Sequence, residues 1–472
     1  MTRRRVALGL VTSLWCVLGL AVLATYGGRV TADEPQYLLS ATSLVEDGDL
    51  DIADELADER WRDYHEAQLP EQTKPLDDGR RLSPHDPLLP VLLAVPVALG
   101  GWVGAKLFMA GVAGALAVAL VAVARRLGVD ERRALLAGAC FALVSPFAVY
   151  GTQLYPELVG ALVVTGAAGA LLALPSMRGT VGVVAAVAVL PWLSVKYAPV
   201  AAALGVVGLV RLALLGHLRR ALALAAGLGG AAAVCAAGHL AIYDALTPYA
   251  VGDHFTGGEL TVMGTSPNRL GRTRRLLGLV VDRDFGLAAW APGWLLLLPA
   301  LGAMARDGVR RRAPEALVIA LPLAAGWAVA TWVALTMHGY WWSGRQVVVV
   351  LPLAVLAVAR WGPPARWLVA GAAAGALNYA WLAVEGLAGR LTWVVDPWRT
   401  TAPVMRALRP LLPDLAHPGW LDEVRWCLWI AAAAALVASG WRRLGRDEDA
   451  AAREGPQPDH PLVDVDRHRA VR

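Results

Sequence analysis

The stretch that decides the fold is WVGAKLFMAGVAGALAVALVAVA, Trp102 to Ala124, which carries a single charge at Lys106. A helix of about 20 apolar residues crosses the roughly 30 Å hydrocarbon core of a bilayer, and a helix satisfies its own backbone there. Similar apolar runs recur along all 472 residues, of which 57% are hydrophobic and 17% charged, with a mean hydropathy of +0.50. The sequence therefore predicts an all-α, polytopic membrane helical bundle.

The run just before this stretch, Pro87 to Gly101, is short and contains Pro90 and Pro96. If both runs crossed the membrane, the arginine clusters at 125–126 and 132–133 would face outside, against the positive-inside rule. We therefore expect the short run to be an interfacial or re-entrant helix. The chain begins with three arginines and an apolar run from Val6 to Tyr26, which we interpret as an uncleaved first span rather than a signal peptide.

Threading the remaining runs with the positive-inside rule predicts about twelve transmembrane helices with both termini in the cytoplasm. The integral domain covers 1–444, its first extracytoplasmic loop covers 28–101, and the tail at 445–472 is predicted to be disordered and cytoplasmic. The later spans are expected near 134–152, 158–175, 180–195, 198–215, 221–243, 286–305, 315–337, 346–360, 366–386 and 425–441. We expect a multi-pass protein of the cell membrane.

The net charge of +5 comes from arginines dispersed in short clusters between apolar runs, which indicates membrane topology rather than nucleic-acid binding. The four cysteines lie in or beside apolar runs without metal-ligand spacing and are interpreted as packing residues. From Arg29 to Asp86 the chain holds sixteen acidic residues against six basic ones, so the first outer loop is acidic. The longer polar segments all fall on the predicted outer side, and we expect the chemistry there.

The first apolar run is followed by TADEPQYL, Thr31 to Leu38, with the acidic pair Asp33 and Glu34 where the chain leaves the bilayer. One interpretation is local, because Glu34 and Pro35 suit the first turn of a helix. The other is functional, because a carboxylate shielded by the bilayer edge can have a raised pKa and accept a proton.

Several motifs, taken in order, resemble the GT-C superfamily of membrane glycosyltransferases, and more narrowly a bacterial branch of it. Besides the acidic pair after the first helix, they are DGRRLSPHDPLLP at 78–90, LYPEL at 154–158, PWLSVKYAP at 191–199, LVVDRDFGLAAWAP at 279–292 and WWSGRQ at 341–346. The similarity extends over roughly Leu8 to Leu356.

The resemblance implies an inverting enzyme that transfers a hexose or pentose from a polyprenyl-phosphate donor to a glycan, lipid or protein acceptor of the cell envelope. Within the superfamily, the chain resembles the mannosyl- and arabinosyltransferases that use such donors. The matching positions imply that Asp33, with Glu34 beside it, acts as the base. Adjacent acids do not readily ligate one ion, so we expect no metal and no cofactor, although the acidic loop could host a weak divalent site.

Two cations are candidates for the donor phosphate. Lys196, one of three lysines, lies at the outer end of a predicted helix, and Arg345 follows Gly344 with a planar fork suited to phosphate oxygens. Both could instead extend toward lipid headgroups.

The candidate sugar or acceptor pocket contains Tyr37, Arg80, Ser83, His85, Asp86, Tyr155 and Glu157. For Arg80, Ser83, His85 and Asp86 the alternative is capping of the interfacial helix. For Tyr155 and Glu157 it is a helix start at Pro156, and for Asp282, Arg283 and Asp284 a salt-bridged turn is favoured.

Two other classes remain open: a transporter or flippase of a polyprenyl-linked or polar substrate, and a non-catalytic GT-C-like scaffold protein. A transporter should carry ionisable residues within its helices or two related halves, and no repeated halves are apparent. The sequence leaves the sugar, the acceptor, the linkage and the oligomeric state open.

Overall fold

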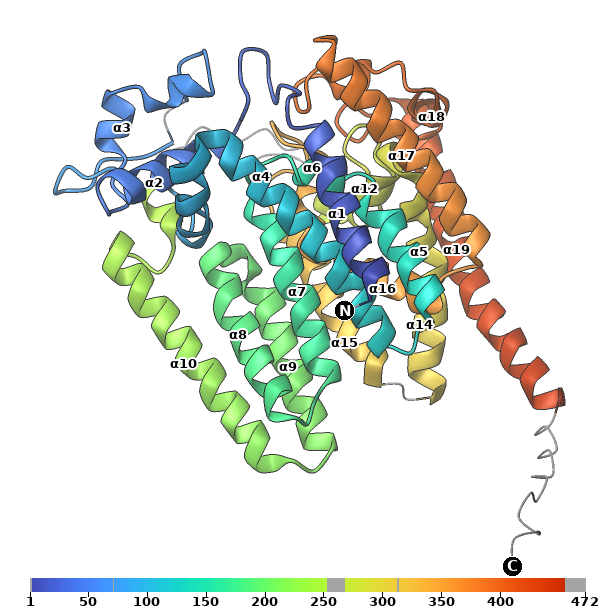
Figure 1. Cartoon of the computed structure of the whole chain (residues 1–472). Coiled ribbons are helices and arrows are strands. Elements are labelled where there is room, and N and C mark those ends of the chain that lie inside the picture. Colours follow the sequence, from blue (N-terminus) through green and yellow to red (C-terminus); the bar gives the residue numbers. More distant parts are fainter. Residues whose placement is uncertain (1, 71, 253–267, 312–313, 455–472) are drawn as a thin grey trace, which may run out of the picture.

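The computed structural model describes residues 2–70, 72–252, 268–311 and 314–454, which form helices and isolated β-bridges but no β-strand (Figure 1). The first half contains α1 (Arg3–Leu18), α2 (Glu34–Glu46), α3 (Ala53–Ala57), η1 (Arg60–Asp63), α4 (Leu88–Arg126), α5 (Glu131–Ala142), α6 (Phe147–Tyr150), α7 (Pro156–Leu172), α8 (Met177–Leu193), η2 (Val195–Tyr197), α9 (Ala198–Leu214), α10 (Leu218–Tyr243) and η3 (Pro248–Val251). The second half contains α11 (Arg269–Arg272), α12 (Arg275–Val281), α13 (Leu287–Trp290), η4 (Pro292–Leu296), α14 (Leu297–Arg311), α15 (Pro314–Ala328), η5 (Val329–Val333), η6 (Arg345–Val347), α16 (Leu351–Trp361), α17 (Ala365–Leu387), η7 (Pro397–Arg399), α18 (Pro403–Leu408), η8 (Arg409–Leu411) and α19 (Trp420–Glu454). The all-α prediction is confirmed.

Six helices are long and apolar enough to cross a membrane: Leu88–Arg126, Val195–Leu214, Leu218–Val251, Pro314–Val333, Ala365–Leu387 and Trp420–Leu444. Three more apolar helices are shorter: Pro156–Leu172, Met177–Leu193 and Leu351–Trp361. The membrane character expected from composition is therefore present. Each predicted span contains helix, but the count of twelve is not reached by helices of full spanning length.

Helix α4 is two helices separated by a sharp bend, as the short run before Trp102 predicted. Gly100 and Gly101 have non-helical backbone angles, and Gly101 has a φ of +56°. A Cβ at Gly104 would meet the Pro96 carbonyl oxygen at 2.1 Å, although eight residues separate the two. Eight residues of straight helix would span about 12 Å, so the short apolar helix folds back against the start of the long one.

The first span ends earlier than predicted. Helix α1 stops at Leu18, and the backbone N–H groups of Trp393 and Val394 donate to the carbonyls of Leu23 and Ala24 at 2.9 and 3.1 Å. A Cβ at Gly19 would lie 2.6 Å from the Tyr379 hydroxyl. The apolar residues after Gly19 therefore pack against the 393–394 segment instead of continuing the helix.

Two other predicted spans are interrupted. The 134–152 run breaks into α5 and α6 around Pro146, whose ring removes a backbone donor. Indole N–H groups fill the break: that of Trp294 donates to the Ser145 carbonyl at 2.9 Å, and that of Trp342 to the Ser145 hydroxyl at 2.5 Å. The 286–305 run divides similarly into α13, η4 and the start of α14.

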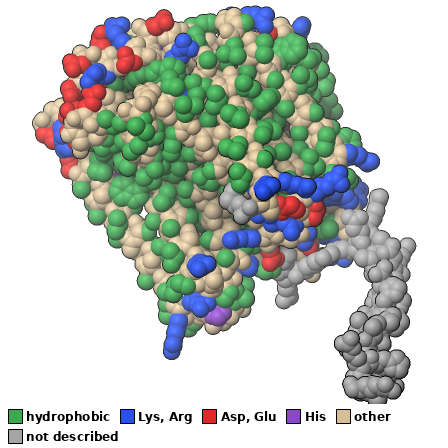
Figure 2. Space-filling view, viewed as in Figure 1, with side chains coloured by type: hydrophobic (Ala, Val, Ile, Leu, Met, Phe, Trp, Pro, Cys, Tyr) green, Lys and Arg blue, Asp and Glu red, His purple; other side chains and the backbone are tan. Residues whose placement is uncertain are grey.

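One end of the bundle is held by arginines that cap helix carbonyls. Arg133 from α5 donates to the carbonyls of Ala359 and Gly362 at 2.6 and 2.9 Å, and Arg443 from α19 donates to Gly362 at 2.8 Å. These carbonyls end α16, and cations favour that end of the helix dipole. At the other end α2 and α3 lie over the bundle, and Figure 2 shows acidic side chains gathered over this region.

Helices α14 and α19 touch backbone to backbone. A Cβ at Gly302 would lie 1.9 Å from the Val437 carbonyl oxygen, and one at Gly440 would lie 1.8 Å from that of Pro299. Small residues allow such close approach in membrane helices. Beyond this contact α19 continues to Glu454, so the first ten residues of the predicted tail are helical, and 455–472 lie outside the described residues, as do 253–267 of the predicted outer segment.

Candidate functional site

Four charged side chains from four separate segments meet in one cluster, which we call the Asp33 cluster. Arg345, at the start of η6, donates from Nε to Glu157 Oε1 at 2.9 Å and from Nη2 to Asp33 Oδ2. Lys196, in η2, donates to the same Glu157 oxygen at 2.7 Å. Two acids therefore balance two cations, and both cations turn inward rather than toward lipid headgroups.

Aromatic rings enclose the guanidinium of Arg345. Its Cζ lies 4.3 Å from the centroid of the Tyr155 ring and 4.9 Å from that of Trp341, within cation–π range. The Lys196 ammonium lies 5.5 Å from the Tyr197 ring centroid. Only two of the five N–H groups of Arg345 are used by Glu157 and Asp33 in these contacts, so the fork retains donors for an anion.

The cluster has a closed side and an exposed side. The side chains of Glu157 and Arg345 are 1% and 6% exposed, whereas those of Asp33 and Lys196 retain 18% and 21%. A ligand from solvent would therefore reach Asp33 and Lys196 first. A surface hollow of about 230 Å³ lies elsewhere, between α19 and the Pro410–Leu411 segment, and is lined mainly by apolar residues.

Asp33 is ionised by its surroundings, contrary to the raised pKa expected from sequence. Burial alone would raise its pKa, but the charges of Arg345, His85 and Lys196 outweigh burial and hold the pKa well below its usual range. In this arrangement Asp33 carries the negative charge that a base needs but binds a proton only weakly.

Glu34 has a different task from its neighbour. Its Oε2 accepts from the Thr31 backbone N–H at 2.9 Å, and its Oε1 accepts from the Leu154 N–H at 2.8 Å. Burial raises the pKa of Glu34, while Lys106 and the two N–H groups favour its charged form. With both oxygens engaged by backbone N–H groups, Glu34 joins the loop after α1 to the segment before α7, and of the two acids only Asp33 reaches the cations of the cluster.

The expected helix starts are present as well. Helix α2 begins at Glu34 with Pro35 in its first turn, and α7 begins at Pro156 with Tyr155 as its N-cap residue. For Glu157 and Tyr155 the local and functional interpretations hold together, because the same helix start directs both side chains at Arg345.

Asp86 braces the segment that carries Lys196. Its Oδ2 accepts from the Val195 N–H at 2.9 Å, and its Oδ1 lies 2.8 Å from His239 Nε2. The other ring nitrogen of His239 lies 2.8 Å from the Cys235 carbonyl oxygen, which can only accept. Nδ1 therefore carries a proton, and a second proton is held between the ring and the Asp86 carboxylate.

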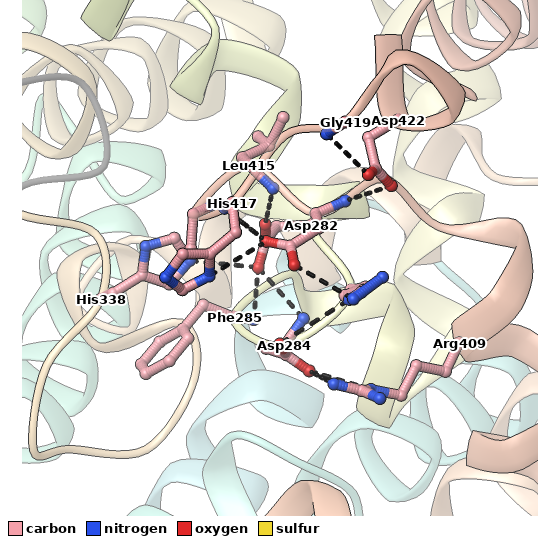
Figure 3. A network of polar contacts seen from close by, with 12 residues as sticks. Asp282, Asp284, Phe285, His338, Arg409, Leu415, His417, Gly419 and Asp422 are labelled. Atoms are coloured by element: carbon pink, nitrogen blue, oxygen red, sulfur yellow. Dashed lines mark hydrogen bonds and ion pairs between the residues drawn. The ribbon is translucent and has the colours of Figure 1, made fainter. Parts of the chain in front are cut away.

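A second network anchors the loop that leads to Arg345 (Figure 3). Asp282 Oδ1 accepts from the Phe285 N–H at 2.7 Å and lies 3.3 Å from His338 Nε2, and its Oδ2 accepts from the Leu415 N–H at 3.0 Å. Arg409 donates to Asp284 at 2.7 Å. The salt-bridged turn favoured from sequence is thus a junction of three segments.

The other predicted pocket residues are distributed around the Asp33 cluster. The Tyr37 ring lies 4.9 Å from the His85 ring between centroids, and burial together with Asp33 and Glu157 raises the pKa of the Tyr37 hydroxyl. Ser83 is buried. Arg80 does not join the cluster: it pairs with Asp78 at 2.7 Å, and both side chains are more than 40% exposed.

Sequence reasoning missed Lys106 and His239. Lys106 Nζ donates to the Arg29 carbonyl at 2.5 Å, and its charge acts on Glu34. Both residues are ionisable side chains inside apolar runs, where they are rare and usually paired. Their rarity within apolar runs is the feature of the sequence that could have identified Lys106 and His239.

Several buried polar atoms beside the Asp33 cluster have no hydrogen-bond partner among the described residues. They are Glu157 Oε2, the Tyr197 hydroxyl and both side-chain polar atoms of Gln153, next to the Leu154 N–H that binds Glu34. Most buried polar groups are paired, so such atoms need an explanation. Ordered water or a bound polar ligand would satisfy such atoms.

Comparison with known proteins does not assign the chain to a family. No protein-family model, no curated protein and no solved structure is significantly similar to the chain. The fold and site therefore define a helical protein with membrane-spanning character and a buried cluster of paired charges.

Proposed function

We propose that the protein is a GT-C-like membrane glycosyltransferase that moves a sugar from a polyprenyl-phosphate donor to a cell-envelope acceptor on the extracytoplasmic side. The observation that carries the proposal is the Asp33 cluster, in which two acids lie together with two cations suited to a phosphate, at the loop-rich end of the bundle. In this proposal the three shorter apolar helices also cross the membrane, as do α1, the α5–α6 segment and the α13–α14 segment, giving about twelve spans with both termini in the cytoplasm.

The first step is an exchange of partners. A donor phosphate arriving at the exposed edge attracts Arg345 and Lys196, which now neutralise Asp33 and Glu157. Phosphate oxygens match the planar fork of Arg345 and the point charge of Lys196. When Arg345 shifts toward the phosphate, the charge that depresses the pKa of Asp33 moves away while burial remains, so this pKa rises. Asp33 becomes a better base when the donor is bound.

The chemical step then follows. Asp33 accepts the proton of an acceptor hydroxyl, the hydroxyl oxygen bonds to the anomeric carbon, and the bond from that carbon to the phosphate oxygen breaks. Polyprenyl phosphate leaves with the bonding electrons, and single displacement inverts the anomeric centre. General base catalysis of this kind contributes about 10²- to 10⁴-fold to a rate.

The test is transfer of radiolabelled sugar from a panel of polyprenyl-phosphate hexoses and pentoses to membrane acceptors by the purified protein in liposomes. We expect Asp33→Asn to lower the transfer rate by about 100-fold or more. Asp58→Asn, an exposed acid of the same outer loop, is the matched control. Equal rates for Asp33→Asn and wild type at equal amounts of folded protein would end the proposal.

One observation favours a transporter or flippase instead. His239 lies inside an apolar helix of spanning length and is paired with Asp86, as proton-coupled residues in transporters often are. Movement of the labelled lipid across the liposome bilayer without sugar transfer, unaffected by Asp33→Asn, would support that function. If the protein shows neither sugar transfer nor lipid movement, the scaffold interpretation is the one that remains.

A further inference from the structure

Three carboxylates gather where α2 ends and α3 begins, in the first outer loop. Asp47 is the C-cap residue of α2, and Asp54 and Glu55 lie in the first turn of α3. One ligand oxygen from each lies within 4.8 Å of those of the other two. This group is separate from the Asp33 cluster, although α2 connects the two along the chain.

The neighbouring acids of the same loop are already engaged. Asp49 Oδ1 accepts from the Ser43 hydroxyl and from the Asp51 N–H, both at 2.9 Å. Asp51 Oδ1 accepts from the N–H groups of Ala53 and Arg81 at 3.1 and 2.8 Å. These bonds fix the turn between the two helices, so Asp47, Asp54 and Glu55 are the acids that remain to face one another.

Glu55 is the independent sign of a ligand. The residue is 2% exposed, and neither of its carboxylate oxygens has a hydrogen-bond partner among the described residues. The nearby Arg60 pairs with Glu46 at the surface, where both side chains are more than 40% exposed. A buried carboxylate beside two further acids is stabilised by a proton or by a bound cation, and a cation would engage all three acids at once.

We propose that Asp47, Asp54 and Glu55 bind a divalent cation, and that the cation is Ca²⁺. All three offer carboxylate oxygens, the hard ligands that Ca²⁺ and Mg²⁺ prefer. Ca²⁺ is commonly held by several protein carboxylates, whereas Mg²⁺ retains several waters and usually takes only one or two. The three oxygens lie within 4.8 Å of one another, as ligands of one ion must, and a site built from three protein carboxylates therefore favours Ca²⁺.

The bound ion would fasten the end of α2 to the start of α3. The carbonyl end of α2 adds its own negative dipole to the site. Because Asp33 is the N-cap residue of α2, this junction holds the far end of the helix that presents the proposed base. The inference does not rest on the proposed function, since binding is measured without any transfer assay.

The experiment is equilibrium binding of radioactive Ca²⁺ to the purified full chain in detergent, after removal of divalent ions with a chelator. We expect one saturable site in wild type with a dissociation constant at or below about 1 mM, the range of extracellular calcium modules. Glu55→Gln and Asp54→Asn should each weaken binding at least about tenfold. Asp63→Asn, another exposed acid of the loop, is the matched control and should bind as wild type does.

Each result decides the matter. Absence of saturable binding up to about 5 mM Ca²⁺ overturns the site, and so does unchanged affinity in Asp54→Asn. Asp54 is exposed, so this variant remains informative if the buried Glu55→Gln protein does not fold. Displacement of Ca²⁺ by an equal concentration of Mg²⁺ would overturn the choice of ion.

Discussion

At the scale of residues, one arginine controls how two acids behave. Arg345 binds both Asp33 and Glu157, and Glu157 is shared with Lys196, so removing either cation changes the charge seen by the other three groups. Charges buried together are coupled strongly because the surrounding dielectric is low. The acid next in sequence, Glu34, stands outside this exchange because both of its oxygens hold backbone N–H groups.

We expect the stability contributed by Asp33 to depend on pH. Asp33→Asn should lower the thermal midpoint near neutral pH, because breaking a buried ion pair costs about 3–5 kcal/mol and this pair, with Asp33 18% exposed, belongs at the lower end. The pKa of Asp33 is depressed in the folded protein. The stabilisation is therefore complete above the unfolded pKa of about 4 and is lost as pH falls through the folded value.

Thermal midpoints of wild type and Asp33→Asn, compared from about pH 7 to about pH 3, measure this effect. The gap between the two proteins should be constant down to about pH 5 and then narrow. Asp58→Asn should show little gap at any pH because its carboxylate is exposed. A gap that grows toward acid would contradict the ion-pair assignment.

The residues of the site were largely visible in the sequence, but their partners were not. Asp33, Glu157, Lys196 and Arg345 were all candidates because each is a charged side chain in a motif at the end of an apolar run. Whether Arg345 met lipid or a carboxylate depended on a contact across 312 positions, which no local pattern encodes. The expectation of a raised pKa for Asp33 was wrong for the same reason: the distant Arg345 lowers that pKa.

At the scale of elements, glycines decide how closely helices approach. Gly302 and Gly440 place the backbones of α14 and α19 in direct contact, and Gly104 lets the two parts of α4 fold together. In each case a Cβ would meet a carbonyl oxygen of the backbone, which cannot swing away as a side chain can.

We expect Gly302→Ala to destabilise the protein. Its new methyl would lie 1.9 Å from the Val437 carbonyl oxygen, so α19 would have to move away from α14. Overpacking of this kind typically costs about 1–3 kcal/mol. Gly166→Ala in α7 is the matched control, because nothing lies within 4 Å of its Cβ and alanine favours a helix interior by about 1 kcal/mol.

Thermal midpoints by fluorescence-detected gel filtration compare the two variants. The expected changes have opposite signs, a lower midpoint for Gly302→Ala and an equal or higher one for Gly166→Ala. Equal changes in the thermal midpoint of the two variants would mean that α19 does not pack on α14 as described.

The apolar runs predicted where helices occur better than where they end. Composition located each run because burying backbone in lipid requires helix, and the bend at Gly100 and Gly101 agrees with the short run placed before Trp102. The early end of α1 and the break at Pro146 depended on partners distant in sequence, the 393–394 segment and the indoles of Trp294 and Trp342.

At the scale of the whole molecule, the two ends of the bundle are chemically different. Arginines bind the carbonyl ends of helices at one end, while acids, aromatic rings and the Asp33 cluster occupy the other. Positive residues are retained on the cytoplasmic side during insertion, so this difference predicts which end faces outward.

Cysteine labelling tests the orientation. In a Cys427→Ala background, a membrane-impermeant maleimide added to intact cells should label Gln68→Cys in the first outer loop and should not label Arg219→Cys between α9 and α10. Both positions are exposed in the structure. If only Arg219→Cys is labelled, the true topology is the inverse of the predicted one, and the Asp33 cluster does not face the outside.

The 312 positions that separate Asp33 from Arg345 have a consequence for biosynthesis. The ribosome delivers the acid of this pair in the first tenth of the chain and its arginine only after nearly three quarters. Until Arg345 has been synthesised, Asp33 lacks the cation that binds it directly. The Asp33 cluster is therefore completed late in translation, and a chain arrested before Arg345 would carry Asp33 without the arginine that binds it.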